Sequence, residues 1–178
     1  MHPIARRNES VNDPRDNNCC RRKVFTIKVF IENEAHSNRK NTFNEKTLEY
    51  VGTAAITGEY PFAYGFILNT TGMDGDNVDC FVITEKPLKS GELVDCEPIG
   101  LMEQMETSWE HPEEVEEDHK VLAALAGESA VIDQTVKAMM RKYVPHIFDH
   151  IPGKKIVLGE FRDKESAIQY IQGRRDKS

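Results

Sequence analysis

Residues 60–83 read YPFAYGFILNTTGMDGDNVDCFVI, and the rest of the chain is best interpreted outward from this stretch. An apolar and aromatic run, typical of a strand, leads into a glycine-rich loop, and a second β-type run follows. The loop carries three aspartates, Asp74, Asp76 and Asp79. Carboxylates this close repel one another by several kcal/mol if they are desolvated and unpaired. A cation is therefore expected among them, and Mg²⁺, which takes oxygen ligands, is the natural candidate.

The Asp-x-Asp pattern is also found in calcium loops, in phosphoaspartyl enzymes and in simple turns. A calcium loop starting at Asp74 fails, because Val78 and Asp79 stand where an oxygen ligand and a glycine are required. A phosphoaspartyl nucleophile is disfavoured, since it is expected at the end of a buried strand and polar residues 69–72 precede Asp74 instead. An Asp-Gly turn capped by its own side chains stays open.

The flanking sequence predicts a protein built mostly of short strands. Residues 24–31 alternate between two sets of side chains with the period of two that is typical of a strand. Similar β-type runs, separated by Gly, Pro, Asn and Asp, occur at residues 64–68, 78–84, 93–99, 120–125 and 155–161. Short strands at such intervals suggest a small barrel or sandwich.

Two helices are expected late in the chain, and both look like packing elements. Apolar residues recur at spacings of three and four between Ile132 and Ile147, which predicts one helix with a single apolar stripe. Pro145 should end or kink this helix, because it has no backbone N–H to donate. A last helix is expected to begin after Asp163 as its N-cap and to stop at Gly173.

Composition limits the cellular setting and the partners. The chain has 178 residues and a net charge of −7; residues 1–23 carry +3, so the remainder carries −10. We expect a flexible tail over residues 1–22 and one domain over residues 23–178. No apolar run approaches the roughly 20 residues of a membrane span and no secretory signal is visible, so we expect a cytoplasmic protein without membrane or nucleic-acid partners. Its thiols, Cys19 and Cys20 in the tail included, are expected to be reduced and non-catalytic.

Acidic residues are concentrated in one block of the chain. Eight acidic and no basic residues lie between Glu103 and Asp118. Most of them are expected in a solvated loop, and Trp109 within the block is expected to be a local packing residue.

The decisive stretch resembles the signature of soluble inorganic pyrophosphatases, which are Mg²⁺-dependent enzymes. The family pattern is close to Tyr-Pro-x-x-Tyr-Gly followed by Asp-Gly-Asp-Pro-x-Asp, and it stands here at residues 60–65 and 74–79. The likeness continues at further charged positions, namely Glu32, Lys40, Glu106, Asp118 and Lys120. The resemblance implies an α+β fold, with a small closed, OB-like barrel of about five strands and two or more flanking helices. It also implies a homo-oligomer.

The resemblance implies hydrolysis of pyrophosphate to two orthophosphates by a metal-activated water. Several Mg²⁺ ions would be held by carboxylates, namely Asp74, Asp76, Asp79, Glu106, Asp118 and Glu32. Asp76 would receive or orient the proton of the attacking water. The phosphate oxygens would be contacted by Lys40, Lys120 and Tyr64, which offset the negative charge. Asp76, Lys120 and Tyr64 are therefore the expected catalytic residues.

The chain also departs from the family pattern, mainly around the phosphates. Asn77 replaces the usual proline, Thr42 a glutamate, Gly52 an arginine, and Ile151-Pro152 a Tyr-Lys pair. The cationic clamp, meaning the set of basic residues that would bind the phosphates, is thus thinned to fewer members, which predicts weaker substrate binding. Six basic residues are candidates to substitute: Arg39, Lys46, Arg141, Lys142, Lys154 and Lys155. The alternative function is a divergent relative that acts on another phosphorylated compound or serves as a metal- or phosphate-binding module.

Overall fold

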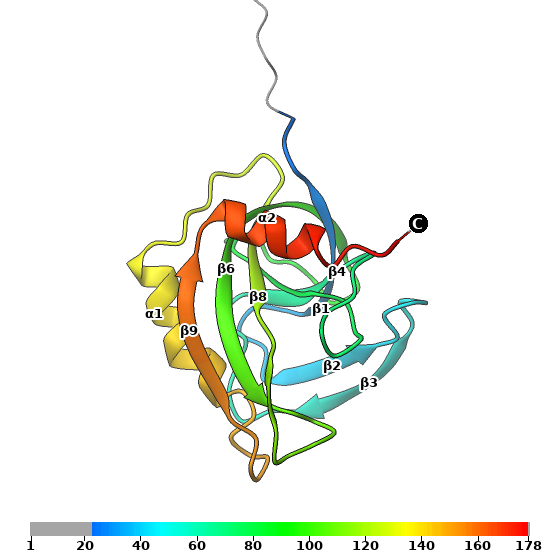
Figure 1. Ribbon diagram of the computed structural model, residues 1–178, viewed down its shortest axis with the longest axis vertical. Coiled ribbons are helices and arrows are strands. Elements are labelled where there is room, and N and C mark those ends of the chain that lie inside the picture. The colour runs from blue at the N-terminus through cyan, green and yellow to red at the C-terminus, as the bar shows by residue number, and fades with distance from the viewer. Residues whose placement is uncertain (1–22, 178) are drawn as a thin grey trace, which may run out of the picture.

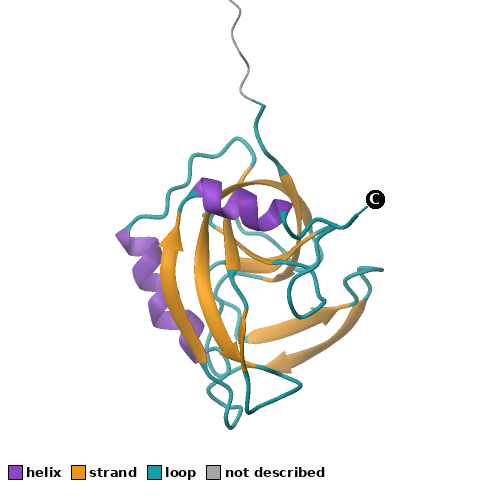
Figure 2. Cartoon of the chain, in the orientation of Figure 1, coloured by secondary structure: helices purple, strands orange, loops and turns teal. Residues whose placement is uncertain are grey.

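The computed structural model describes residues 23–177, and seven of its nine strands join in one mixed sheet (Figures 1 and 2). The sheet contains β1 (Ile27–Asn33), β4 (Ala63–Ile67), β5 (Asp79–Val82), β6 (Leu93–Thr107), β7 (Val115–Glu117), β8 (Lys120–Leu125) and β9 (Ile156–Arg162). A separate hairpin is formed by β2 (Arg39–Phe43) and β3 (Tyr50–Ala55), and it stands apart from the larger sheet in Figure 2. The helices are α1 (Gln134–Tyr143), a 3₁₀ turn (Val144–His146) and α2 (Lys164–Gln172).

Five strands are paired in a ring. The order β1-β4-β5-β8-β6 returns to β1, because β1 pairs with both β4 and β6. Every pairing in the ring is antiparallel except that of β5 with β8, which is parallel. The expected α+β class, a mixed sheet with two helices, is confirmed.

Alternation along the strands divides the core between the two helices. Cys80 and Val82 of β5 belong to a cluster that includes Ala167 of α2, whereas Phe81 belongs to a second cluster that includes Met140 of α1. Successive strand residues point to opposite faces, so one strand supplies both clusters. Accordingly, α2 lies across β6 and α1 runs beside β9 in Figure 1.

Helix boundaries follow the expected signals. Asp163 Oδ1 accepts a hydrogen bond from Ser166 N at 2.9 Å, and Gly173 is the C-cap of α2, as expected. The helix expected up to Ile147 stops at Tyr143 and continues as the 3₁₀ turn that contains Pro145. This change fits the missing N–H of proline.

The strand boundaries were predicted less well. The strand expected at residues 93–99 runs on to Thr107, and β2, β3 and β7 were not predicted. The expected tail over residues 1–22, with Cys19 and Cys20, lies outside the described residues. Within residues 23–177, no helix is both long and apolar enough to cross a membrane.

Candidate active site

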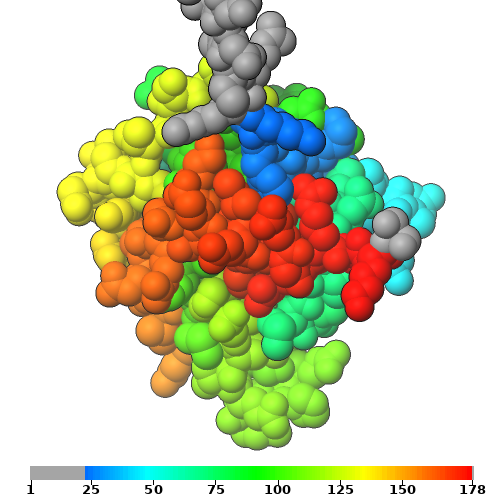
Figure 3. Space-filling view, turned by 45° about the horizontal axis from the view of Figure 1, so that its top comes forward, coloured from blue at the N-terminus to red at the C-terminus, as the bar shows by residue number. Residues whose placement is uncertain are grey.

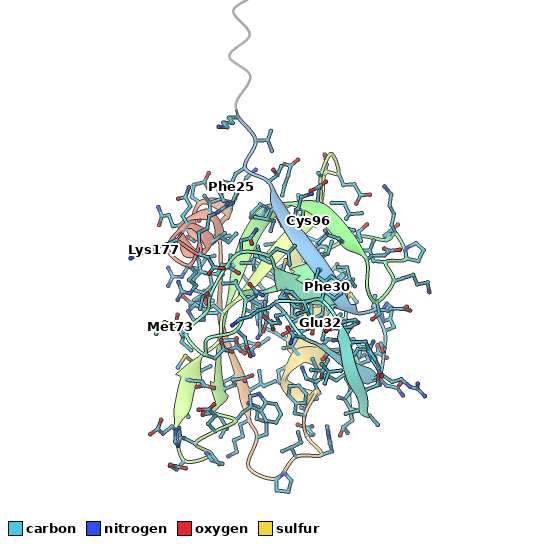
Figure 4. All side chains as sticks on the ribbon, turned by 90° about the vertical axis from the view of Figure 1, so that its right-hand side faces the viewer. Phe25, Phe30, Glu32, Met73, Cys96 and Lys177 are labelled. Carbon is cyan, nitrogen blue, oxygen red and sulfur yellow. The ribbon has the colours of Figure 1, made fainter. Side chains whose placement is uncertain are left out.

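One cavity of about 1110 Å³ gathers every site residue that the sequence singled out. Its lining includes Glu32, Lys40, Tyr64, Asp74, Asp76, Asp79, Glu106, Asp118 and Lys120. They come from β1, β2, β4, β5, β6, β8 and the loops between them. Figure 4 shows Glu32 in the interior of the molecule and Met73, just before the acidic loop's first aspartate, at its outer edge.

Two glycines explain local features of the decisive stretch. A Cβ at Gly65 would lie 1.8 Å from the carbonyl oxygen of Phe30, so the close approach of β4 to its neighbour β1 requires glycine here. Gly75 has a φ of 91° between Asp74 and Asp76. Asp74 Oδ1 accepts a hydrogen bond from Asp76 N at 3.1 Å. The Asp-Gly turn capped by its own side chain is therefore present, and it forms part of the cavity wall.

Lys120 lies between two of the predicted metal ligands. Parallel pairing of Cys80 with Val121 brings the preceding residues, Asp79 and Lys120, side by side. Lys120 Nζ donates to Asp79 Oδ2 and, at 2.5 Å, to Asp118 Oδ2. Burial by itself lowers the pKa of this lysine, but the two carboxylates outweigh burial and raise it. Lys120 is therefore charged, and it shares its charge between Asp79 and Asp118.

Glu106 is neutralised by a different lysine. Its Oε1 accepts a hydrogen bond from Lys154 Nζ at 2.8 Å, and its Oε2 accepts one from Gln104 Nε2 at 3.1 Å. The side chains of Lys154 and Glu106 are only 3% and 7% exposed. Lys154 is one of the six candidate substitute cations, and it contacts the site by binding Glu106. Of these six, Lys46 alone is among the described residues that line the cavity.

Burial also changes the acidity of groups deeper in the cavity. It raises the pKa of Glu32 to about 8, although Lys40 opposes the shift. Burial raises the pKa of Asp74 above its ordinary value. The phenol pKa of Tyr64 is raised strongly, first by burial and then by the charge of Asp79. Tyr64 therefore keeps its proton and can donate it in a hydrogen bond.

Part of the cavity lining is apolar, which was not predicted. Its lining residues are Trp109, Val144, Ile147, Phe148 and Ile156. Trp109 is 52% exposed, yet it packs locally: its ring meets that of Phe148 edge-on at 5.3 Å. The β6–β7 loop and the α1–β9 loop, which carry the two rings, lie at the same end in Figure 1. The β6–β7 loop projects in yellow-green at the lower edge of Figure 3.

Comparison with known proteins identifies the family. A family model for inorganic pyrophosphatases matches residues 29–177. The chain belongs to the inorganic pyrophosphatase family. It is 32% identical to the inorganic pyrophosphatase of Aquifex pyrophilus over 64% of this chain and 66% of that one. The Nanoarchaeum equitans enzyme is 29% identical over 82% of this chain and 93% of its own. The solved inorganic pyrophosphatase of Helicobacter pylori superposes with a TM-score of 0.70 at 28% identity, covering 84% of this chain and 91% of that chain.

One departure from the pyrophosphatase pattern has a structural counterpart that sequence reasoning missed. Glu45 lines the cavity, and its Oε2 accepts a hydrogen bond from Asn77 N at 2.6 Å. Proline, the usual residue at position 77, has no N–H to donate. Burial raises the pKa of Glu45 to about 7. The unusual Asn77 was the only signal in the sequence for this contact.

The donor set suits magnesium in a particular way. Within residues 23–177, no three His, Cys, Asp or Glu side chains are grouped closely enough to hold an ion by themselves. Magnesium commonly uses one or two carboxylates and completes its shell with water and substrate phosphates. Asp74 and Asp76 line the cavity and take part in none of the ion pairs found between described residues. The carboxylates of this pyrophosphatase-family chain therefore fit magnesium that arrives hydrated or with substrate.

Proposed function

We propose that this chain hydrolyses inorganic pyrophosphate to two orthophosphates in a reaction that depends on Mg²⁺. The observation that carries the proposal is that nine residues chosen from the sequence all line one cavity. The same lining contains carboxylates without ion-pair partners among the described residues and the lysines that could hold phosphate. The names of the relatives support the same activity.

The side chains of the cavity support distinct roles in this reaction. Asp74, Asp76 and Asp79 would hold magnesium together with water and substrate oxygens, and the ion would lower the pKa of a bound water and offset phosphate charge. Asp76 is exposed at the cavity mouth, and its carboxylate would accept the proton of the attacking water. The water oxygen forms a bond to one phosphorus, and the bond from that phosphorus to the bridging oxygen breaks.

The second group of residues stabilises the charge on the phosphates. Lys40 and Lys120 would donate charge-assisted hydrogen bonds to phosphate oxygens. Tyr64, which keeps its phenolic proton, would donate a neutral one. Glu106 and Asp118 would bind further magnesium together with substrate.

The test is release of phosphate from pyrophosphate by the purified chain. We expect turnover with Mg²⁺, and we expect Asp76→Asn to lower kcat by on the order of 10²–10⁴-fold. Asp95→Asn is the matched control, because Asp95 is an exposed aspartate that pairs with Lys28 outside the cavity. Absence of turnover above the blank with Mg²⁺, Mn²⁺, Zn²⁺ and Co²⁺ would overturn the proposal.

The finer features stay predictions. The ring of five paired strands supports the small closed, OB-like barrel, and the number of cavity carboxylates supports several Mg²⁺ ions. The homo-oligomer and the cytoplasmic location rest on the family resemblance and on the sequence. Light scattering of the purified chain would measure the oligomeric state.

A further inference from the structure

Lys40 lies beside the apolar part of the cavity lining. Lys40 Nζ lies 5.8 Å from the centroid of the Phe148 ring, and Phe148 in turn contacts the ring of Trp109. A phosphate held by Lys40 would therefore lie next to an aromatic pair. An inorganic anion can take at most one hydrogen bond from this pair, from the indole N–H of Trp109, and it gains nothing from the apolar ring faces.

Only the two rings of the apolar wall have surface to offer a ligand. Val144 and Ile147 are 2% and 3% exposed and belong to the core around α1. Trp109, by contrast, is 52% exposed, and Phe148 is partly exposed. Large aromatic side chains gain most when they are covered, and their faces and edges pair well with another aromatic ring.

The cavity is also larger than pyrophosphate needs. Its volume of about 1110 Å³ lies slightly above the roughly 300–1,000 Å³ that is usual for organic ligands. Even ten waters of metal shells would fill only about 300 Å³ at ~30 Å³ each. The rest, roughly 800 Å³, is left for the phosphates, the ions and a further group.

We propose that this cavity also takes aromatic diphosphate monoesters, with the organic ring on Trp109 and Phe148 and the diphosphate at Lys40 and Lys120. The proposal rests on the proposed function, because the same carboxylates and lysines perform the reaction. Water attacks the terminal phosphorus, a bond forms between them, and the bond from that phosphorus to the bridging oxygen breaks. The products are orthophosphate, the organic monophosphate and one proton.

The first test compares phenyl diphosphate with methyl diphosphate and pyrophosphate as substrates in Mg²⁺. We expect kcat/KM for the phenyl ester to exceed that for the methyl ester at least tenfold. Phe148→Ala should reduce this phenyl-to-methyl ratio to about one. Tyr50→Ala is the matched control, since Tyr50 is a 60% exposed aromatic residue outside the cavity lining, and it should leave the ratio unchanged.

The second test needs no substitution. Trp109 is the single tryptophan of the chain, so its fluorescence reports directly on whether the wall is covered. The phenyl ester of methylenediphosphonate, in which CH₂ replaces the bridging oxygen, should change the emission of Trp109 in a saturable way. Methylenediphosphonate itself should produce a smaller change at equal occupancy.

The possible failures are distinguishable. If pyrophosphate is hydrolysed but the phenyl and methyl esters react equally, the aromatic subsite is overturned and the proposed function stands. The same holds if the phenyl analogue leaves the fluorescence of Trp109 unchanged at concentrations that inhibit pyrophosphate hydrolysis. If neither pyrophosphate nor the esters react, both proposals fail.

Discussion

The carboxylates of the cavity fall into two groups that differ in their partners. Glu106 is bonded to Lys154, and Asp79 and Asp118 share Lys120. Asp74, Asp76, Glu32 and Glu45 line the same space, yet none of them has an ion-pair partner among residues 23–177. The first group already holds positive charge supplied by the chain itself. The second group needs positive charge from outside, so metal should act mainly there.

The two groups also serve the fold differently. Lys154 fixes the α1–β9 loop to β6, because its Nζ donates to Glu106 and, at 2.5 Å, to the carbonyl oxygen of Thr107. Lys154 Nζ also lies 3.9 Å above the ring of Trp109. The acidic loop around Asp76, in contrast, is held by backbone turns and by Glu45. Paired charges therefore stabilise the frame of the cavity, whereas unpaired charges leave its mouth ready for a cation.

The largest effect is expected when the paired group loses its lysine. Lys154→Met leaves the carboxylate of Glu106 buried without a cation, which should lower the free energy of unfolding by about 3–5 kcal/mol. Urea denaturation without magnesium measures this loss. Adding Glu106→Gln in the same chain should restore most of it, because the uncompensated charge is gone. A loss below about 1 kcal/mol would show that Glu106 does not depend on Lys154.

Much of this arrangement could be predicted from the sequence, for identifiable reasons. The acidic loop and its neighbours carry an ordered pattern of residue types, and that pattern needs no knowledge of distant contacts. Strands β4, β5 and β8 are short, almost continuously buried runs that are mainly apolar, and the cap at Asp163 is a local signal. The residues that determine each of these features lie close together in the chain, so the features can be predicted without a structure.

The features that were missed depend on distant contacts or lack periodicity. Strand β2, at Arg39–Phe43, has no buried residue and therefore no alternation of apolar and polar side chains. Glu45 meets Asn77 across 32 positions of sequence, and Lys154 meets Glu106 across 48. Trp109 and Phe148 come together from two loops, and neither loop has a pattern that points to the other.

An intermediate effect is expected from pH in the unpaired group. Glu45 has a pKa of about 7 when folded against an ordinary value of 4.5, so the folded chain keeps a proton that the unfolded chain has lost. The contribution of Glu45 to stability without magnesium should therefore fall as pH rises from 4.5 to about 7 and then level off. Allowing for solvent screening of this half-buried group, the share of Glu45 is about 1–2 kcal/mol.

Two variants isolate that share. Glu45→Gln should flatten the fall, whereas Glu49→Gln, at an exposed glutamate of the same hairpin, should leave it intact. Saturating magnesium should also flatten the profile of the wild-type chain, since a cation favours the ionised acids. Denaturation midpoints between pH 4.5 and 8 measure all three. If stability falls with pH as steeply in Glu45→Gln as in the wild-type chain, the fall does not come from Glu45.

The smallest effect is expected from adding a cation beside the unpaired group. Gly52 pairs in register with Thr42, which lines the cavity, and a Cβ at Gly52 meets nothing within 4 Å. Gly52→Arg therefore brings a guanidinium to the hairpin without a clash, and Gly52→Ala controls for the lost glycine. If the clamp is thinned here, the KM for pyrophosphate should fall about fivefold, because an exposed charge-assisted contact contributes on the order of 1 kcal/mol.

If the arginine pairs with Asp76 or Glu45 instead, the unpaired group becomes a paired one, magnesium affinity falls and KM rises. The direction of the change in KM thus decides whether the hairpin faces the substrate or the acids.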